Sequence, residues 1–177
     1  MLDEEKIKKK ALRYKTHLPV LNFVLENYKP KQIMEIGMGD NSTKVFLDYD
    51  FEELTSVETD KEWIDRCDNI FVKKDNHKII HCSDDAPEQF ITEGLDLGFV
   101  DGRPPLKRGV CVNILLEKNA DIIIFHDAEP RFRSGYGYNN LKIKDGYQLF
   151  FYNQKDPWTG LVMKNELVTD ELKKFMS

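Results

Sequence analysis

The chain has 177 residues, 41 % of them hydrophobic and 32 % charged, which is the size and composition of one globular domain. No apolar run approaches the roughly 18–20 residues that span a bilayer, the charged amino terminus lacks a signal-peptide segment, and the three cysteines include no CxxC pair. From the cysteines we therefore expect a cytoplasmic protein without a disulfide framework or a zinc site. The net charge of −5 gives no bulk attraction for nucleic acid.

The first part of the chain predicts helices before any strand. The charged segment Asp3–Tyr14 is a helix candidate, and apolar residues recur at helical spacing over Leu18–Tyr28 until Pro30 ends that helix. We expect one domain, with N-terminal helices over residues 1–30 and a core over residues 31–177.

From residue 31 onward, short apolar segments alternate with helical segments. The predicted strands are Gln32–Ile36, Leu54–Glu58, Lys78–Cys82, Leu95–Val100, Ala120–Phe125, Tyr147–Tyr152 and Gly160–Lys164. Asn41, Ser42 and Thr43 offer N-cap side chains for a predicted helix that runs to about Tyr49. The other predicted helices are Lys61–Cys67, Ala86–Ile91 and Pro104–Lys118. Strands that alternate with helices predict a parallel, three-layer α/β sheet, in which ligands bind at the carboxyl ends of the strands.

Two glycines follow the first predicted strand directly. Gly37 and Gly39 let a backbone turn pass under a ligand with no Cβ in the way. The dinucleotide fingerprint GxGxxG needs a third glycine, but the chain has Ser42 there, and that fingerprint does not explain the acid Glu35 before the loop. The pattern therefore disfavours NAD and suits a ligand without a phosphate.

Acidic residues also follow the next two predicted strands. Glu58 lies about 20 residues after the glycine loop, where a carboxylate can accept hydrogen bonds from ribose hydroxyls. Asp84 and Asp85 follow the third strand, where a side chain or backbone amide can reach an adenine edge. Acids at three successive strand ends, facing one crevice, predict a nucleoside-binding site.

These segments resemble class I S-adenosylmethionine (SAM)-dependent methyltransferases over most of the chain, from about Leu18 to Lys164. The matching stretches are Met34–Thr43 (MEIGMGDNST), Ser56–Glu58 (SVE), Ser83–Asp85 (SDD), Phe99–Gly102 (FVDG) and Phe125–Ala128 (FHDA). The VDG and HD motifs are most similar to those of small O-methyltransferases, including sugar and polysaccharide methyltransferases. The resemblance implies a Rossmann-like sandwich with a mostly parallel seven-stranded sheet and one antiparallel strand near the C-terminus.

The resemblance also implies that SAM is the cofactor and that the strand ends bind it. The implied cofactor-binding residues are Glu35, Gly37, Gly39, Asn41, Ser42, Thr43, Glu58, Ser83, Asp84, Asp85 and Asp101.

Candidate catalytic groups follow the fourth and fifth strands. Methyl transfer to an alcohol needs a well-positioned acceptor and the loss of its proton, which a base or a metal promotes. In one interpretation Asp101 and Asp127 share Mg²⁺ or another divalent cation, as in the metal-dependent O-methyltransferases they resemble, although Ala128 stands where those enzymes commonly have Asn. In a second, His126 or Asp127 is a general base without a metal. In a third, the aspartates only cap turns and His126 is a core histidine.

The remaining histidines are weaker candidates. His17 precedes the apolar helix and is close enough in sequence to fold over the site, but an N-cap role for Thr16 is the favoured interpretation. His77 and His81 flank the third strand and are expected to be structural or exposed.

The long loop after the fifth strand is expected to overhang an acceptor pocket. Arg131, Arg133 and Tyr136 lie in it, and the fourth strand is followed on the same side by Arg103, Lys107 and Arg108. Arginines bind carboxylates and phosphates, and aromatic rings stack on sugars, so these residues predict a polar acceptor such as a glycan or nucleotide-linked sugar. A solvated, flexible loop is the alternative.

The leading hypothesis is therefore SAM-dependent O-methylation of a hydroxyl on a sugar or related polar acceptor. Two alternatives stay open: a metal-dependent, catechol-like small-molecule methyltransferase and a noncatalytic SAM-fold binding module. The acidic balance and the lack of an Asn/Asp-Pro-Pro-Tyr/Phe motif disfavour nucleic-acid methylation. The sequence leaves the oligomeric state open.

Overall fold

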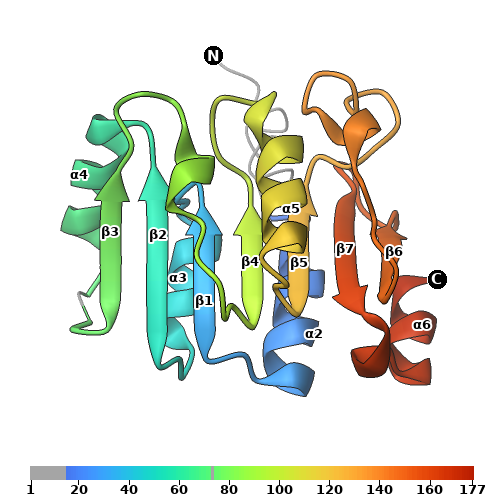
Figure 1. Cartoon of the computed structure of the whole chain (residues 1–177). Coiled ribbons are helices and arrows are strands. Elements are labelled where there is room, and N and C mark those ends of the chain that lie inside the picture. Colours follow the sequence, from blue (N-terminus) through green and yellow to red (C-terminus); the bar gives the residue numbers. More distant parts are fainter. Residues whose placement is uncertain (1–14, 73) are drawn as a thin grey trace, which may run out of the picture.

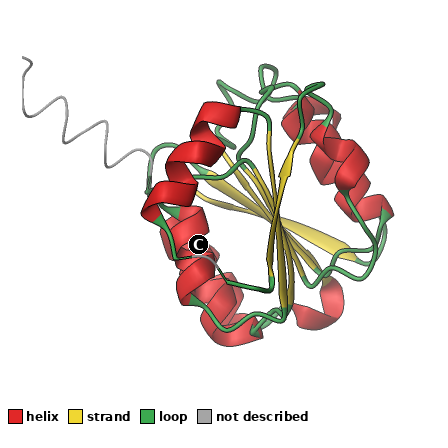
Figure 2. Cartoon of the chain, turned by 90° about the vertical axis from the view of Figure 1, so that its left-hand side faces the viewer, coloured by secondary structure: helices red, strands yellow, loops and turns green. Residues whose placement is uncertain are grey.

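A computed structural model of the chain describes residues 15–72 and 74–177, and the predicted helix Asp3–Tyr14 lies outside them. Seven strands form one twisted sheet with helices on both faces, as the edge-on view shows (Figure 1, Figure 2). The prediction of a three-layer, Rossmann-like sandwich is confirmed. Within the described residues, no helix is both long enough and apolar enough to cross a membrane.

The elements follow the alternation expected from the sequence. The strands are β1 (Gln32–Ile36), β2 (Glu53–Glu58), β3 (His77–His81), β4 (Leu97–Val100), β5 (Ile122–His126), β6 (Tyr147–Tyr152) and β7 (Thr159–Lys164). The α-helices are α2 (Leu18–Tyr28), α3 (Ser42–Asp48), α4 (Lys61–Ile70), α5 (Lys107–Glu117) and α6 (Asp170–Met176). Three short 3₁₀ helices are η1 (Pro87–Phe90), η2 (Tyr138–Asn140) and η3 (Asn165–Leu167).

The strand order is β3-β2-β1-β4-β5-β7-β6. Strands β1 to β5 pair in parallel, whereas β7 is antiparallel to both of its neighbours, β5 and β6. From β1 the sheet extends through β2 to β3 on one side, and the chain then returns to add β4 and β5 on the other side of β1. Open α/β sheets bind ligands at such a reversal of the strand order. The carboxyl ends of β1, β2, β4 and β5 therefore meet along one edge, the upper one in Figure 1.

Two apolar layers hold the helices to the sheet. On one face, α2, α3 and α6 pack against β-strand side chains that include Leu54, Phe99 and Ile124. On the other face, α5 packs against a second set that includes Val100 and Phe125. Every residue of β5 is buried, which agrees with its nearly unbroken apolar sequence.

Three of the local differences between the expected elements and the structure concern helices. The helix expected from Pro104 begins only at Lys107, and the short helix expected over Ala86–Ile91 is the 3₁₀ helix η1. The N-cap role favoured for Thr16 is wrong: His17 occupies the cap position, and the Thr16 hydroxyl lies 2.8 Å from Nε2 of His126 instead. A long-range polar partner has replaced the local cap.

Candidate functional site

A cavity of about 1200 Å³ opens at the carboxyl edge of the sheet. Its walls come from the loops after β1, β2, β4 and β5, from α4, and from the segment before α2. The predicted site residues that line it are Gly37, Gly39, Asn41, Ser42, Glu58, Asp101, Arg103, His126, Asp127 and Tyr136. Those that do not line it are Glu35, Thr43, Ser83, Asp84, Asp85, Arg131 and Arg133.

The glycine loop after β1 lies directly against the loop after β4. Gly37 has φ +92°, and a Cβ there would lie 2.3 Å from the Cα of Gly102. Its N–H donates to the carbonyl of Val57 at 2.8 Å, which ties the loop to β2. No side chain fits at this position, so the backbone itself forms the wall of the cavity.

Glu35 supports this loop from beneath. Its side chain is fully buried and accepts hydrogen bonds from the hydroxyls of Ser42 (2.7 Å), Thr43 (2.9 Å) and Ser56 (2.8 Å). Burial raises the pKa of Glu35 to about 7, although the three hydroxyls oppose the shift. Glu35 and Thr43 thus fasten the start of α3 to β1 and β2 and do not face the cavity.

The Glu35→Gln variant should lose a pH-dependent part of the protein's stability. The pKa of about 7 for Glu35 in the folded chain exceeds the value of about 4.3 for an unfolded glutamate, so the free energy of unfolding falls as the pH rises between these values. Burial lowers the pKa of His17 to about 4, so His17 makes the free energy of unfolding rise with pH over part of this range. Because His17 is present in both proteins, the quantity to measure is the difference in free energy of unfolding between wild type and variant at each pH. Chemical denaturation at about pH 5 and about pH 8 should show wild type losing about 2–3 kcal/mol relative to the variant. A difference that does not change with pH would contradict the buried, proton-holding role.

Glu58 closes the loop from the end of β2. Its Oε2 accepts from the N–H of Met38 at 2.9 Å, and its Oε1 accepts from the N–H groups of Thr59 (2.7 Å) and Asp60 (2.9 Å). Each carboxylate oxygen accepts about two hydrogen bonds, so Oε2 keeps capacity for a hydroxyl in the cavity. The residue can therefore serve both the loop and a ribose.

Two residues of α4 complete this side, and the sequence analysis did not identify them. The indole N–H of Trp63 donates to the carbonyl of Met38 at 2.7 Å. Arg66 lies 4.6 Å above the Trp63 ring and binds Asp40 at 2.6 Å. Their spacing of three residues on the helix that follows Glu58 was the available signal, because such residues share one helix face.

The other side of the cavity carries a charged cluster around Arg108. Its Nη1 lies 2.8 Å from Asp101 and 2.8 Å from Asp127, and its other nitrogens donate to the carbonyls of Gly102 (2.9 Å) and Asp101 (3.0 Å). Burial would raise the pKa of Asp101, but His126 and Arg108 hold that pKa well below its ordinary value. Arg108 thus fixes two carboxylates at the ends of β4 and β5.

This arrangement does not fit the expected magnesium site between Asp101 and Asp127. The guanidinium of Arg108 already bridges the two carboxylates and neutralises part of their charge. A hard divalent ion would have to displace that cation, which also satisfies two backbone carbonyls.

His126 has partners at both ring nitrogens. Nδ1 lies 3.2 Å from Oδ2 of Asp101, and Nε2 lies 2.8 Å from the hydroxyl of Thr16. Burial lowers the pKa of His126, but Asp101 more than offsets this, so the net direction is upward. The imidazole is therefore oriented by a carboxylate, as a general base requires.

His17 folds over the site, an arrangement that the sequence analysis ranked second. Its ring lies 4.9 Å from that of His126 and 5.2 Å from that of Phe99, measured between centroids. The residue is 3 % exposed, and neither ring nitrogen has a hydrogen-bond partner within the described part of the chain.

The two loop arginines that were predicted to bind the methyl acceptor have partners within the chain instead. Arg131 binds Asp156 at 2.6 Å, and Arg133 donates to the carbonyl of Ala128 while its guanidinium lies 4.4 Å above the Phe151 ring. Neither lines the cavity, whereas Arg103 and Tyr136 do.

In the turn after β3, Asp84 forms hydrogen bonds with nearby residues of the chain. Asp84 accepts from the side-chain amide of Gln89 at 3.0 Å and from the thiol of Cys82 at 3.1 Å. The adenine contact expected of residues 83–85 therefore stays a prediction.

The comparison with known proteins identifies the fold of the chain but assigns it to no family. No family model matches the chain, and no curated protein does. A proposed methyltransferase from Escherichia coli aligns over 84 % of each chain with a TM-score of 0.60 and 14 % identity. A Podospora anserina methyltransferase bound to S-adenosylhomocysteine (SAH) aligns over 81 % of this chain and 75 % of its own, with a TM-score of 0.58 and 17 % identity.

The likeness also extends to an enzyme of a different kind. A spermidine synthase from Thermotoga maritima aligns over 82 % of this chain and 56 % of its own, with a TM-score of 0.56 and 13 % identity. The cavity lies at the carboxyl edge of the strands in this shared architecture. The chain thus has the Rossmann-like fold that is found in class I methyltransferases.

Proposed function

We propose that the chain is a SAM-dependent methyltransferase. The observation that carries this proposal is the cavity, which has the glycine loop and Glu58 at one end and the cluster of Asp101, His126 and Asp127 at the other. SAH in a neighbour of the same fold supports the choice of cofactor. When bound, SAM supplies an electrophilic methyl group on a cationic sulfur.

The residues around the glycine loop fit the nucleoside part of this cofactor. The backbone of Gly37 and Gly39 leaves the cavity wall free of side chains, and Oε2 of Glu58 keeps an acceptor position for a ribose hydroxyl. Trp63 and Arg66 also line the cavity, and the guanidinium of Arg66 lies 4.6 Å above the indole ring. These groups would bind and orient; none is needed for proton transfer.

The cluster at the other end fits the chemistry of the acceptor. His126, oriented by Asp101, is the proposed proton acceptor, and an acceptor hydroxyl would take the place of the Thr16 hydroxyl at its Nε2. The carboxylate of Asp127, held by Arg108, would position that hydroxyl.

We propose a polar hydroxyl acceptor, such as a sugar or glycan. Arg103 and Tyr136 support it, since both line the cavity next to the charged cluster and offer a cation and an aromatic ring. Incubation with methyl-labelled SAM and a panel of sugars, acidic glycans and catechols should give labelled sugar or glycan. Label in catechols only when Mg²⁺ is added would favour the catechol-like alternative, and SAM binding without any transfer would favour a noncatalytic module.

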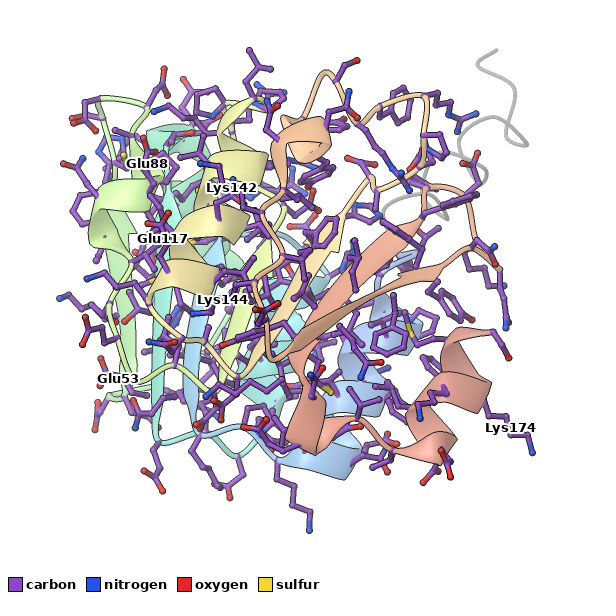
Figure 3. The ribbon with its side chains drawn as sticks, turned by 45° about the vertical axis from the view of Figure 1, so that its right-hand side comes forward. Glu53, Glu88, Glu117, Lys142, Lys144 and Lys174 are labelled. Carbon is purple, nitrogen blue, oxygen red and sulfur yellow. The ribbon has the colours of Figure 1, made fainter. Side chains whose placement is uncertain are left out.

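Glu58→Gln should weaken SAH binding by about 10–100-fold, because a hydrogen bond to a charged group contributes about 1.5–3 kcal/mol. Glu53→Gln is the matched control, since Glu53 and Glu58 are the two ends of β2. Figure 3 shows Glu53 at the lower edge of the sheet, away from the cavity edge. Calorimetric titration should show unchanged affinity for the control, and equal affinities of both variants and wild type would contradict the proposal.

A further inference from the structure

Three metal-ligating side chains converge at the inner end of the cavity from distant parts of the chain. His17 precedes α2, Asp101 follows β4, and His126 ends β5. One ligand atom from each lies within 4.8 Å of the other two. All three residues line the cavity, so a ligand from solvent can reach them.

His17 is the member of this cluster that the proposed function leaves unexplained. It is 3 % exposed, and within the described residues both of its ring nitrogens lack a hydrogen-bond partner. A buried polar group without a partner costs free energy, so such groups in native proteins normally have one. A partner that binds imidazole nitrogen is therefore expected beside His17.

The other two side chains are already oriented by their outer atoms. The Thr16 hydroxyl binds Nε2 of His126, and Arg108 binds Oδ1 of Asp101. Metal-binding histidines normally make such a bond through the ring nitrogen that does not bind the metal. The inner atoms, Nδ1 of His126 and Oδ2 of Asp101, are 3.2 Å apart. That separation is close to the roughly 3.3 Å expected between two ligands on a tetrahedral ion with bonds of about 2.0–2.1 Å.

We propose that His17, Asp101 and His126 bind one divalent transition-metal ion of the Zn²⁺ type. Two imidazoles and one carboxylate suit Zn²⁺ better than Mg²⁺, which prefers oxygen ligands and bound water. Three protein ligands leave an open coordination position, and all three ligand residues line the cavity. This site differs from an ion shared by Asp101 and Asp127, since Asp127 stays with Arg108.

The ion would have a direct use if the proposed function holds, and this step rests on that function. A hydroxyl bound at the open position has a lowered pKa and loses its proton more readily. With the ion bound, His126 would be a ligand and not the base, so the proton would pass to solvent. The alkoxide oxygen would form its bond to the methyl carbon as the bond between that carbon and the sulfur of SAM breaks, and SAH would leave.

The test is Zn²⁺ titration of full-length protein stripped with a chelator, followed by metal analysis after dialysis. Wild type should bind one Zn²⁺ per chain, and His17→Gln and Asp101→Asn should bind it at least about tenfold more weakly. His81→Gln is the matched control, because His81 is exposed and does not line the cavity. It should bind as wild type does.

A measurement on the unaltered protein avoids the risk that a buried substitution unfolds the chain. The chain has four histidines, so their imidazole NMR signals can be assigned with His77→Gln and His81→Gln. On addition of Zn²⁺, the signals of His17 and His126 should move and the other two should not.

Absence of Zn²⁺ binding by wild type overturns the proposal, as does movement of only the His77 and His81 signals. Unchanged binding in both folded ligand variants also overturns it. SAH titration of the same samples separates the two proposals: intact SAH binding without Zn²⁺ binding removes the metal site and leaves the methyltransferase proposal standing.

Discussion

Replacing Gly37 by alanine should abolish measurable SAH binding and lower the free energy of unfolding by about 3 kcal/mol or more. The new Cβ would lie 2.3 Å from the Cα of Gly102 and 2.4 Å from its nitrogen, both backbone atoms that no rotamer change can move away. The positive φ of +92° adds a conformational cost for any L-residue. Relief of the overlap would separate the loops after β1 and β4, both of which line the cavity.

The Gly146→Ala variant separates the effect of the steric overlap from the cost of a positive φ. Gly146 has φ +89°, but a Cβ there would meet nothing within 4 Å, so only the conformational cost of about 1–2 kcal/mol applies. Chemical denaturation should show the smaller loss for this variant, and calorimetry should show wild-type affinity for SAH. Equal stabilities of the two variants, with SAH binding kept in both, would show that the contact between the loops is not needed.

Arg108→Met should lower the free energy of unfolding by about 3–5 kcal/mol, because it leaves buried charges without their partner. Methionine keeps much of the apolar length of the side chain but removes the cation that joins Asp101 to Asp127. It also leaves the carbonyls of Asp101 and Gly102 without their donor. Methyl transfer should be lost with the positions of the two carboxylates.

The loss should depend on pH with a defined sign. In wild type the pKa of Asp101 is lowered, since His126 and Arg108 outweigh burial, so its ionised form contributes stability that disappears as the pH falls. Without Arg108 that pKa rises. The difference between wild type and variant should therefore shrink as the pH is lowered below about 4, where an unfolded aspartate takes up its proton.

Arg133→Met is the control for this experiment. Arg133 contacts a carbonyl oxygen and the ring of Phe151 but no carboxylate within the described part of the chain, and it is only half-buried. Its loss should cost about 1 kcal/mol with little dependence on pH. A loss for Arg108→Met as small as that for Arg133→Met would contradict the bridging role.

The sheet could be predicted because each strand is recognisable from its local amino-acid pattern. β5 reads as a strand buried on both faces, and Gly37 and Gly39 end β1 where a tight turn is needed. Alternating strands and helices then leave few topologies, so the edge that carries the cavity follows from the strand order.

The partners of individual side chains could not be predicted in the same way. Glu35 is next to the glycine loop in sequence, but it lies under the loop because three hydroxyls from two different segments meet it there. Arg131 was expected over the acceptor and instead binds Asp156, 25 residues away. Pairings of this kind depend on tertiary geometry, which local patterns do not encode.

The same reason explains why Arg108 and His17 were undervalued. Arg108 is the second residue of α5, directly after Lys107, and nothing local distinguishes the one cation from the other. His17 reaches the ring of His126 only because α2 packs on the sheet face next to β5.

A crystal structure of the protein grown with SAH would show directly where the cofactor binds. We expect SAH in the cavity, with its ribose at Glu58, its backbone contacts at the glycine loop, and its sulfur turned toward Asp101 and His126. Electron density for SAH elsewhere on the molecule, or a cavity that stays empty at saturating SAH, would contradict the assignment of this site.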